Sequence, residues 1–184
     1  LMIKYFISLI IILFLCEARA NDKEQIILKF EKIENLSFDF EQNVNGKIEE
    51  GKCIIKYERR IYCEYLQSNN KILVSNGKSI VIKTNIGSYY RYSLNSTPLN
   101  LILDKNFILK QIKSLNEKII DDKLIKFTLN ENELKVDIFF NKNTFNLTGW
   151  QTLDIYQNLI LTNIYNVKIN QKIEDNIFRL PKMN

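Results

Sequence analysis

Short apolar–polar alternations separated by turn residues run through most of this chain and limit the folds it can adopt. Leu36, Phe38 and Phe40 alternate with polar residues, which is strand spacing, and Asn45–Gly46 follows as a tight-turn signal. The same pattern predicts strands at 48–57, 61–67, 72–75, 79–84, 89–92, 111–117, 124–129, 135–140, 145–154 and 160–168, and a final edge segment at 178–181. Turns about every 8 to 12 residues favour an antiparallel meander that curls into a barrel or half-barrel.

Two stretches replace the strand spacing with helical patterns. Asn21 or Asp22 can cap a helix whose apolar residues recur at positions 26, 30 and 33, ending near residue 35. Thr97–Pro98 opens a short helix over the apolar residues 99–103, and a second short helix is expected at 104–110. We therefore expect a mainly β (α+β) fold that forms one domain over residues 21–184.

The first twenty residues have the layout of a secretory signal peptide. Lys4 precedes an apolar run at 5–16, and Ala18–Arg19–Ala20 is a small-x-small cleavage site. An uncleaved N-terminal anchor is the alternative, although the run is short for a bilayer span. A lipid-modified Cys16 is disfavoured because the larger Leu15 precedes it. We expect export and a mature chain from Asn21.

Composition disfavours several functional classes. The chain has no histidine, which removes Ser-His-Asp and Cys-His catalysis and imidazole metal sites. Its net charge is +5, and its lysines are scattered among acidic residues, so a nucleic-acid footprint is not expected. We expect no catalytic residues, no metal and no cofactor.

Cys53 and Cys63 remain after the expected cleavage, ten residues apart. A turn-like segment at 58–60 lies midway, so the two cysteines can face each other across a hairpin. In an oxidising compartment they can form a disulfide, provided that their Cα atoms approach within about 7 Å. Two small buried thiols remain the alternative.

The chain has more large apolar side chains than one face of a small sheet needs for its core. They either fill a core or line a pocket for an acyl chain, and composition alone favours the core.

Several segments, in order, resemble the LolA family of periplasmic carriers for outer-membrane lipoproteins. Residues 36–42 (LSFDFEQ) resemble its opening strand, and Gly51 with the strand to Tyr57 resembles the second. Residues 72–78 (ILVSNGK) are similar to a characteristic hairpin, and residues 97–103 resemble the first lid helix. Residues 153–159 and 178–181 are similar to the closing strands.

The resemblance implies an unclosed antiparallel β-barrel with an N-terminal helix and a short helical lid over an apolar cavity. The cavity would take acyl chains of lipoproteins released by an inner-membrane ABC-type complex, and an outer-membrane acceptor would receive them. We expect a periplasmic monomer. The expected lining residues, each of which can also be core, are Phe38, Phe40, Ile55, Tyr57, Tyr65, Leu99, Ile102 and Leu103.

The lid latch departs from the family pattern. Well-known members have an arginine late in the second strand that bonds the lid, whereas here Tyr57 stands at that position and Glu58 replaces the following proline. Tyr57, Arg59 and Arg60 are the candidate latch residues, with a solvated turn as the alternative.

Three other functions compete with the carrier. A LolA-like sensor or envelope-assembly factor without a shuttle role would share the fold but leave lipoprotein sorting normal on depletion. An enzyme could use Asp121–Asp122 or the pair Glu131 and Glu133, although both sets fall in stretches where solvated turns are expected. Single-strand nucleic-acid binding by residues 56–65 is undercut by the acidic residues among them.

Overall fold

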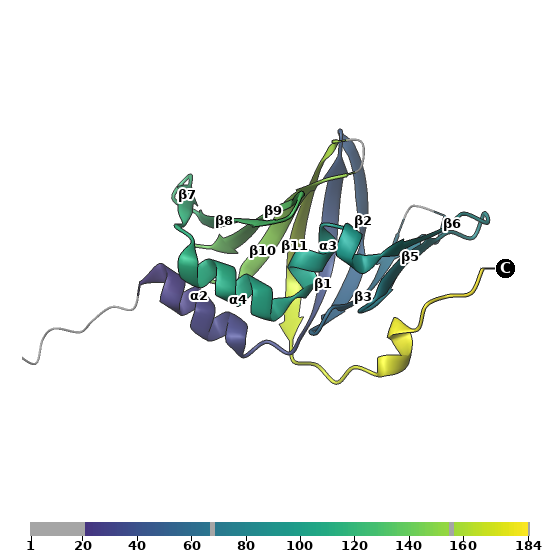
Figure 1. The fold of residues 1–184 in the computed structure, drawn as a ribbon, viewed down its shortest axis with the longest axis horizontal. Coiled ribbons are helices and arrows are strands. Elements are labelled where there is room, and N and C mark those ends of the chain that lie inside the picture. The colour runs from purple at the N-terminus through teal and green to yellow at the C-terminus, as the bar shows by residue number, and fades with distance from the viewer. Residues whose placement is uncertain (1–20, 67–68, 155–156, 184) are drawn as a thin grey trace, which may run out of the picture.

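The computed structural model describes residues 21–66, 69–154 and 157–183 (Figure 1). Within them, eleven strands form one antiparallel sheet in the order β6-β5-β4-β3-β2-β1-β11-β10-β9-β8-β7. Their bounds are β1 (Asn35–Val44), β2 (Lys47–Lys56), β3 (Arg60–Tyr65), β4 (Ile72–Asn76), β5 (Ser79–Lys83), β6 (Tyr89–Ser93), β7 (Lys118–Ile120), β8 (Leu124–Glu131), β9 (Leu134–Asn141), β10 (Leu147–Leu153) and β11 (Leu159–Ile169).

The sheet is curved but does not close. Two meanders, β1 to β6 and β7 to β11, join where β1 pairs with β11, and β6 and β7 remain at the two edges. Asn45 and Gly46 both have positive φ in the β1–β2 turn, as a tight hairpin with this sequence requires. The predicted unclosed half-barrel is confirmed.

Three α-helices of the described chain lie on the concave side of the sheet: α2 (Asp22–Glu31), α3 (Leu99–Leu103) and α4 (Lys105–Ser114) (Figure 1). Asn21 caps α2 by accepting from the Lys23 amide, and Asp104 caps α4 by accepting from the Phe107 amide. The described chain also has two 3₁₀ turns. η1 (Leu94–Ser96) comes just before α3, and η2 (Asp175–Phe178) follows β11 near the C-terminus. No helix of the described residues is long and apolar enough to span a membrane.

Three predicted boundaries were wrong. The first helix ends at Glu31, because Asn35 is already held to the end of β11, where its side-chain Nδ2 donates to the Gln171 carbonyl at 3.0 Å. The strand expected at 111–117 is absent from the described structure: residues 111–114 are the end of α4, whose buried Ile108 and Ile112 continue the helical spacing. β7 starts only at Lys118.

The edge segment expected at 178–181 is not a strand. Phe178 ends η2 and is buried, and the Arg60 guanidinium lies over its ring at 5.4 Å. Asp175 pairs with Lys56 at 2.5 Å and with Arg60 at 3.1 Å. These contacts hold the C-terminal segment against the convex face of the sheet.

Candidate functional site

The concave face of β1 to β3 forms an apolar floor. Phe38 lies opposite Cys53, and Phe40 lies opposite Gly51, which in turn lies opposite Tyr65. The rings of Phe40 and Tyr65 meet edge to face with centroids 5.0 Å apart. A side chain at position 51 would collide with the Phe40 ring, so the glycine lets this ring lie directly on the strand.

The lid over this floor consists of α3 and the start of α4. Ile102 and Leu103 are fully buried, and Leu99 is half-buried at the margin of the core. The structure gathers all the predicted lining residues into one apolar cluster: Phe38, Phe40, Ile55, Tyr57, Ile102 and Leu103 are buried in it, and Tyr65 and Leu99 pack against it.

In the described residues, side chains of the lid and α4 cover the concave face. The lid and α4 place Leu101, Ile108 and Ile112, all buried, on the concave face together with the predicted residues. The described chain has a hollow of about 320 Å³ lined by Glu34, Lys56, Tyr57, Glu58, Lys105 and Asn106, and one of about 190 Å³ lined by Lys135, Asp137, Gln151, Thr152, Leu153 and Leu159. Polar and charged residues make up most of both linings.

Arg59 joins the lid to the β2–β3 turn. Its backbone amide donates to the Leu103 carbonyl at 3.1 Å, at the end of α3. Its guanidinium Nη2 donates to the side-chain oxygens of Asn95 in η1 and Asn100 in α3. The Arg59 carbonyl accepts from Ser75 Oγ at 3.1 Å, which ties the turn to β4. Arg59 has positive φ, and this turn geometry presents its side chain and amide to the lid.

The other two latch candidates do not hold the lid in this way. The Tyr57 ring packs edge to face on Phe30 at 5.6 Å, and its hydroxyl has no hydrogen-bond partner among the described residues. Burial raises the pKa of Tyr57, so the hydroxyl stays neutral. Arg60 points to the convex side, where it meets Asp175 and Phe178.

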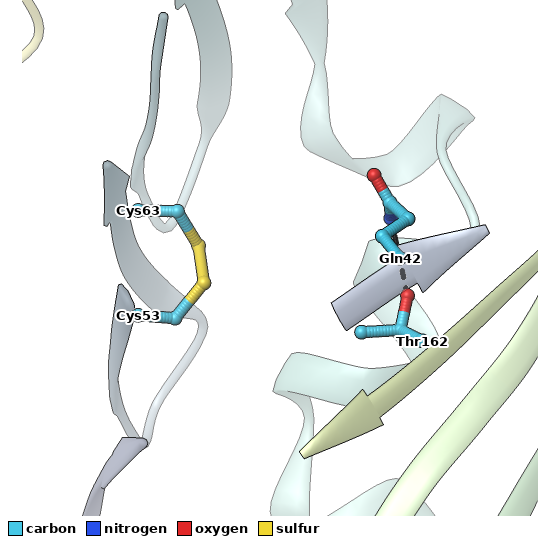
Figure 2. The surroundings of a disulfide bond; sticks show 4 residues. All are labelled: Gln42, Cys53, Cys63 and Thr162. Carbon is cyan, nitrogen blue, oxygen red and sulfur yellow. Dashed lines mark hydrogen bonds between the residues drawn. A yellow bond between two sulfur atoms is a disulfide. The ribbon is translucent and has the colours of Figure 1, made fainter. Parts of the chain in front are cut away.

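Cys53 and Cys63 form a disulfide in the structure (Figure 2). They are directly opposite in the β2–β3 register, with Cα atoms 4.1 Å apart, and both are buried on the concave face. The bond therefore crosslinks the two strands that carry the Arg59 turn.

Polar side chains replace the apolar floor toward the β1–β2 turn. Gln42 Nε2 donates to Thr162 Oγ1 at 3.1 Å across β1 and β11 (Figure 2). Glu49 is buried and pairs with Lys71 at 2.5 Å, and Lys71 Nζ lies 3.7 Å from the Tyr65 ring centroid. Desolvation, with a smaller contribution from Glu49, raises the pKa of Tyr65. The apolar floor thus ends in a buried polar boundary.

Asp137 is a buried carboxylate on the convex face. Its oxygens accept from Thr128 Oγ1 at 2.6 Å and from Lys126 Nζ at 2.9 Å. Burial alone would raise the pKa of Asp137, but these hydrogen bonds and the lysine charges outweigh it, and the pKa lies below its usual value.

The acidic residues considered for catalysis lie in exposed positions. Asp121 and Asp122 are in the β7–β8 turn, where Asp122 pairs with Lys142. Glu131 ends β8, and Glu133 lies in the β8–β9 turn. Among the described residues, no group of His, Cys, Asp or Glu is arranged to hold a metal ion.

Sequence reasoning missed several residues of the covered face. Trp150 packs edge to face on Phe38 at 6.0 Å, and Phe140 contacts both Phe30 and Phe127. The alternation in β8 to β10 carried this signal, since these side chains share the buried face of their strands. The lid acceptors Asn95 and Asn100 had no such signal.

The chain resembles known proteins in fold more than in sequence. A search of curated protein sequences gives no match. Among solved structures, a LolA superfamily protein from Nitrosomonas europaea aligns over 88% of this chain and 99% of its own, at 10% identity and a TM-score of 0.45. An uncharacterized conserved protein from Thermus thermophilus aligns over 86% and 94%, at 10% identity and a TM-score of 0.50, which supports the fold.

The Pseudomonas aeruginosa MucA/MucB complex aligns over 88% of this chain and 62% of the compared chain, at 10% identity and a TM-score of 0.46. The family model described as outer membrane lipoprotein carrier protein LolA matches residues 31–181. Because that match spans most of the chain, from the end of α2 through the lid to the C-terminal segment, the protein belongs to the LolA family.

Proposed function

We propose that this protein is a periplasmic carrier that shelters the acyl chains of lipoproteins released from the inner membrane and delivers them to the outer membrane. The observation that carries the proposal is the apolar concave face beneath α3, covered by a short lid that Arg59 holds by its side chain and its backbone. Such a lid can leave the floor as a unit and expose an apolar surface.

Loading then replaces the lid's side chains on the floor with acyl chains. Re-exposing Leu101, Ile102 and Leu103 costs about 5 to 9 kcal/mol, at roughly 1.5 to 3 kcal/mol for each buried side chain. An acyl chain of about 16 carbons gains on the order of 12 kcal/mol when fully buried, at about 0.8 kcal/mol per CH₂. For an acyl chain that would otherwise be exposed to water, this gain exceeds the cost of displacing the lid, and the Arg59 contacts set how readily the lid closes again.

The expected partners are acylated lipoproteins, an inner-membrane ABC-type complex that loads them and an outer-membrane acceptor. We expect the carrier to act as a monomer, since one lid and one floor make a complete shelter. A disulfide between Cys53 and Cys63 suits an oxidising compartment such as the periplasm.

Depletion of the protein in its own host tests the proposal. Inner and outer membranes are separated, and lipoproteins are followed by mass spectrometry in both fractions and on the purified carrier. Lipoproteins should accumulate in the inner membrane and co-purify with the carrier. Normal sorting after depletion would refute the carrier and favour a sensor or envelope-assembly factor.

Two matched variants connect the phenotype to the lid. Leu99→Asp places a charge at the half-buried margin of the lid, whereas Leu28→Asp places it at an exposed position of α2. Only the first should fail to restore sorting and to retain bound lipoprotein. If both variants restored sorting equally, lipoprotein transport would not depend on the lid.

A further inference from the structure

The β5–β6 hairpin and the C-terminal segment meet at one corner of the molecule (Figure 1). Tyr89 Oη donates to the Pro181 carbonyl at 3.2 Å, and Lys83 Nζ donates to the Lys182 carbonyl at 3.0 Å. We call residues 83–92 together with residues 179–183 the β5–β6 corner. No part of the proposed carrier mechanism uses it.

Large apolar and aromatic side chains are exposed at this corner. Ile86, in the turn between β5 and β6, is 72% exposed, and Tyr90 and Tyr92 are 53% and 44% exposed. The register places Tyr90 opposite Ile82 and Tyr92 opposite Ile80, on the concave face of the sheet. Exposed apolar groups of this size mark a contact surface when they gather in one place.

The two sides of the hairpin differ: one is covered by the C-terminal segment and the other is exposed. The C-terminal segment runs along the convex face, where Val74 and Val81 are buried, while the two tyrosines project from the opposite face. Ile86 lies at the tip between them. A lipid surface fits an exposed apolar hairpin tip with tyrosines beside it, because tyrosine is favoured at the membrane–water interface.

The charged side chains of the two segments that form the corner have one sign. Residues 65–103 contain four basic residues and no acidic one, and residues 176–184 contain two basic residues and no acidic one. Lys71 is taken by Glu49, but Arg91 donates to the neutral Ser79 Oγ at 3.2 Å, and no carboxylate of the described residues pairs with it. The basic residues at the corner are Lys83, Arg91, Arg179 and Lys182.

We propose that the β5–β6 corner docks onto the surface of an anionic phospholipid bilayer. Ile86 and Tyr90 enter the boundary between headgroups and acyl chains, where tyrosine is favoured because one end of its side chain is apolar and the other polar. The four basic side chains lie beside the anionic headgroups. The contact does not depend on cargo, so it is separable from the proposed carrier function.

Vesicle binding by the exported, purified protein tests the proposal. The probes are vesicles of phosphatidylcholine alone and vesicles that contain about a quarter of phosphatidylglycerol. The protein should bind the anionic vesicles, release them at high salt and bind the neutral ones weakly. Ile86→Ser should weaken binding about tenfold, and Lys182→Gln about fivefold.

Leu28→Ser is the matched control, because Leu28 is exposed on α2 away from the corner. It should bind like the original protein, and thermal melting should be the same for both serine variants. Ile86→Trp adds a direct readout: the native Trp150 is buried, so a blue shift on vesicle addition reports insertion at position 86.

Three results would overturn the proposal. One is no binding to either kind of vesicle. Another is an equal loss of binding in Ile86→Ser and Leu28→Ser. The third is binding that needs Ile86 on protein-containing envelope membranes but not on pure lipid, which would assign the corner to a protein partner.

Discussion

Arg59→Met removes the side-chain contacts that hold the lid while keeping a long apolar stem in the β2–β3 turn. The arginine donates to Asn95 and Asn100, and hydrogen bonds from a charged donor contribute about 1.5 to 3 kcal/mol each. Arg59 is partly exposed and its Nε has no partner among the described residues, which favours the lower end of this range. The pair therefore contributes about 3 kcal/mol, and its loss should raise the open fraction of the lid on the order of a hundredfold.

Amide hydrogen exchange measures this change where it occurs. The amide at position 59 donates to the Leu103 carbonyl, and the Asp104 amide donates to the Asn100 carbonyl, so both report detachment or fraying of α3. Exchange at these two amides should accelerate on the order of a hundredfold in Arg59→Met. Amides of the central strands should change far less, because their exchange requires global unfolding.

Arg60→Met is the control, since Arg60 contacts Asp175 and Phe178 on the convex face rather than the lid. It should leave exchange in α3 unchanged. The latch assignment is refuted if both variants accelerate exchange equally, or if Arg59→Met leaves both reporter amides as protected as in the original protein. Uptake of a fluorescent fatty acid should rise with lid opening and gives an independent check.

Three further predictions concern stability. Replacing Cys53 and Cys63 by serine should lower the unfolding free energy in urea by roughly 2 to 3 kcal/mol, because the disulfide closes a short loop in the unfolded chain. An unfolding free energy equal to that of the oxidised original protein would contradict this. The lowered pKa of Asp137 means that its ionised form stabilises the fold above the usual carboxyl pKa of about 3.9 and loses this effect as pH falls toward the folded-state pKa. Asp137→Asn should therefore destabilise the protein in urea more at neutral pH than at about pH 2, and an equal loss at both would count against the assignment. Gly51→Ala should lower the unfolding free energy by about 1 to 3 kcal/mol or more, since the added Cβ would lie 2.1 Å from the Glu64 carbonyl oxygen; an unchanged melting temperature would show that the strands relax freely.

Local patterns predicted the sheet well, for a physical reason. Alternation over residues 36–40 and the Asn45–Gly46 turn depend only on strand geometry and on the φ angles that asparagine and glycine tolerate, so they are readable without tertiary contacts. The same reasoning failed at residues 111–117. There Ile112 continues the apolar face of α4 against the core. A single apolar residue in a short polar segment is compatible with both the helical and the strand period, so the sequence pattern could not distinguish them.

The facing of single residues at the β2–β3 turn was beyond local reasoning. Tyr57, Arg59 and Arg60 lie within four positions, yet one is buried under the helices, one reaches the lid and one points to the convex side. In a strand, side chains one residue apart point to opposite faces of the sheet. The positive φ of Arg59 changes the chain direction further within the turn.

By itself, the sequence determined an antiparallel sheet with a helical interruption, two cysteines able to face each other, and a resemblance to one family. These follow from spacing along the chain, which backbone geometry converts directly into structure. Only the tertiary structure decided that the lid fills the concave face, that Arg59 holds it and that Phe178 packs beneath Arg60. Such contacts join residues that are far apart in the sequence, as Arg59 and Asn100 are, and no local pattern encodes which of several similar side chains will meet.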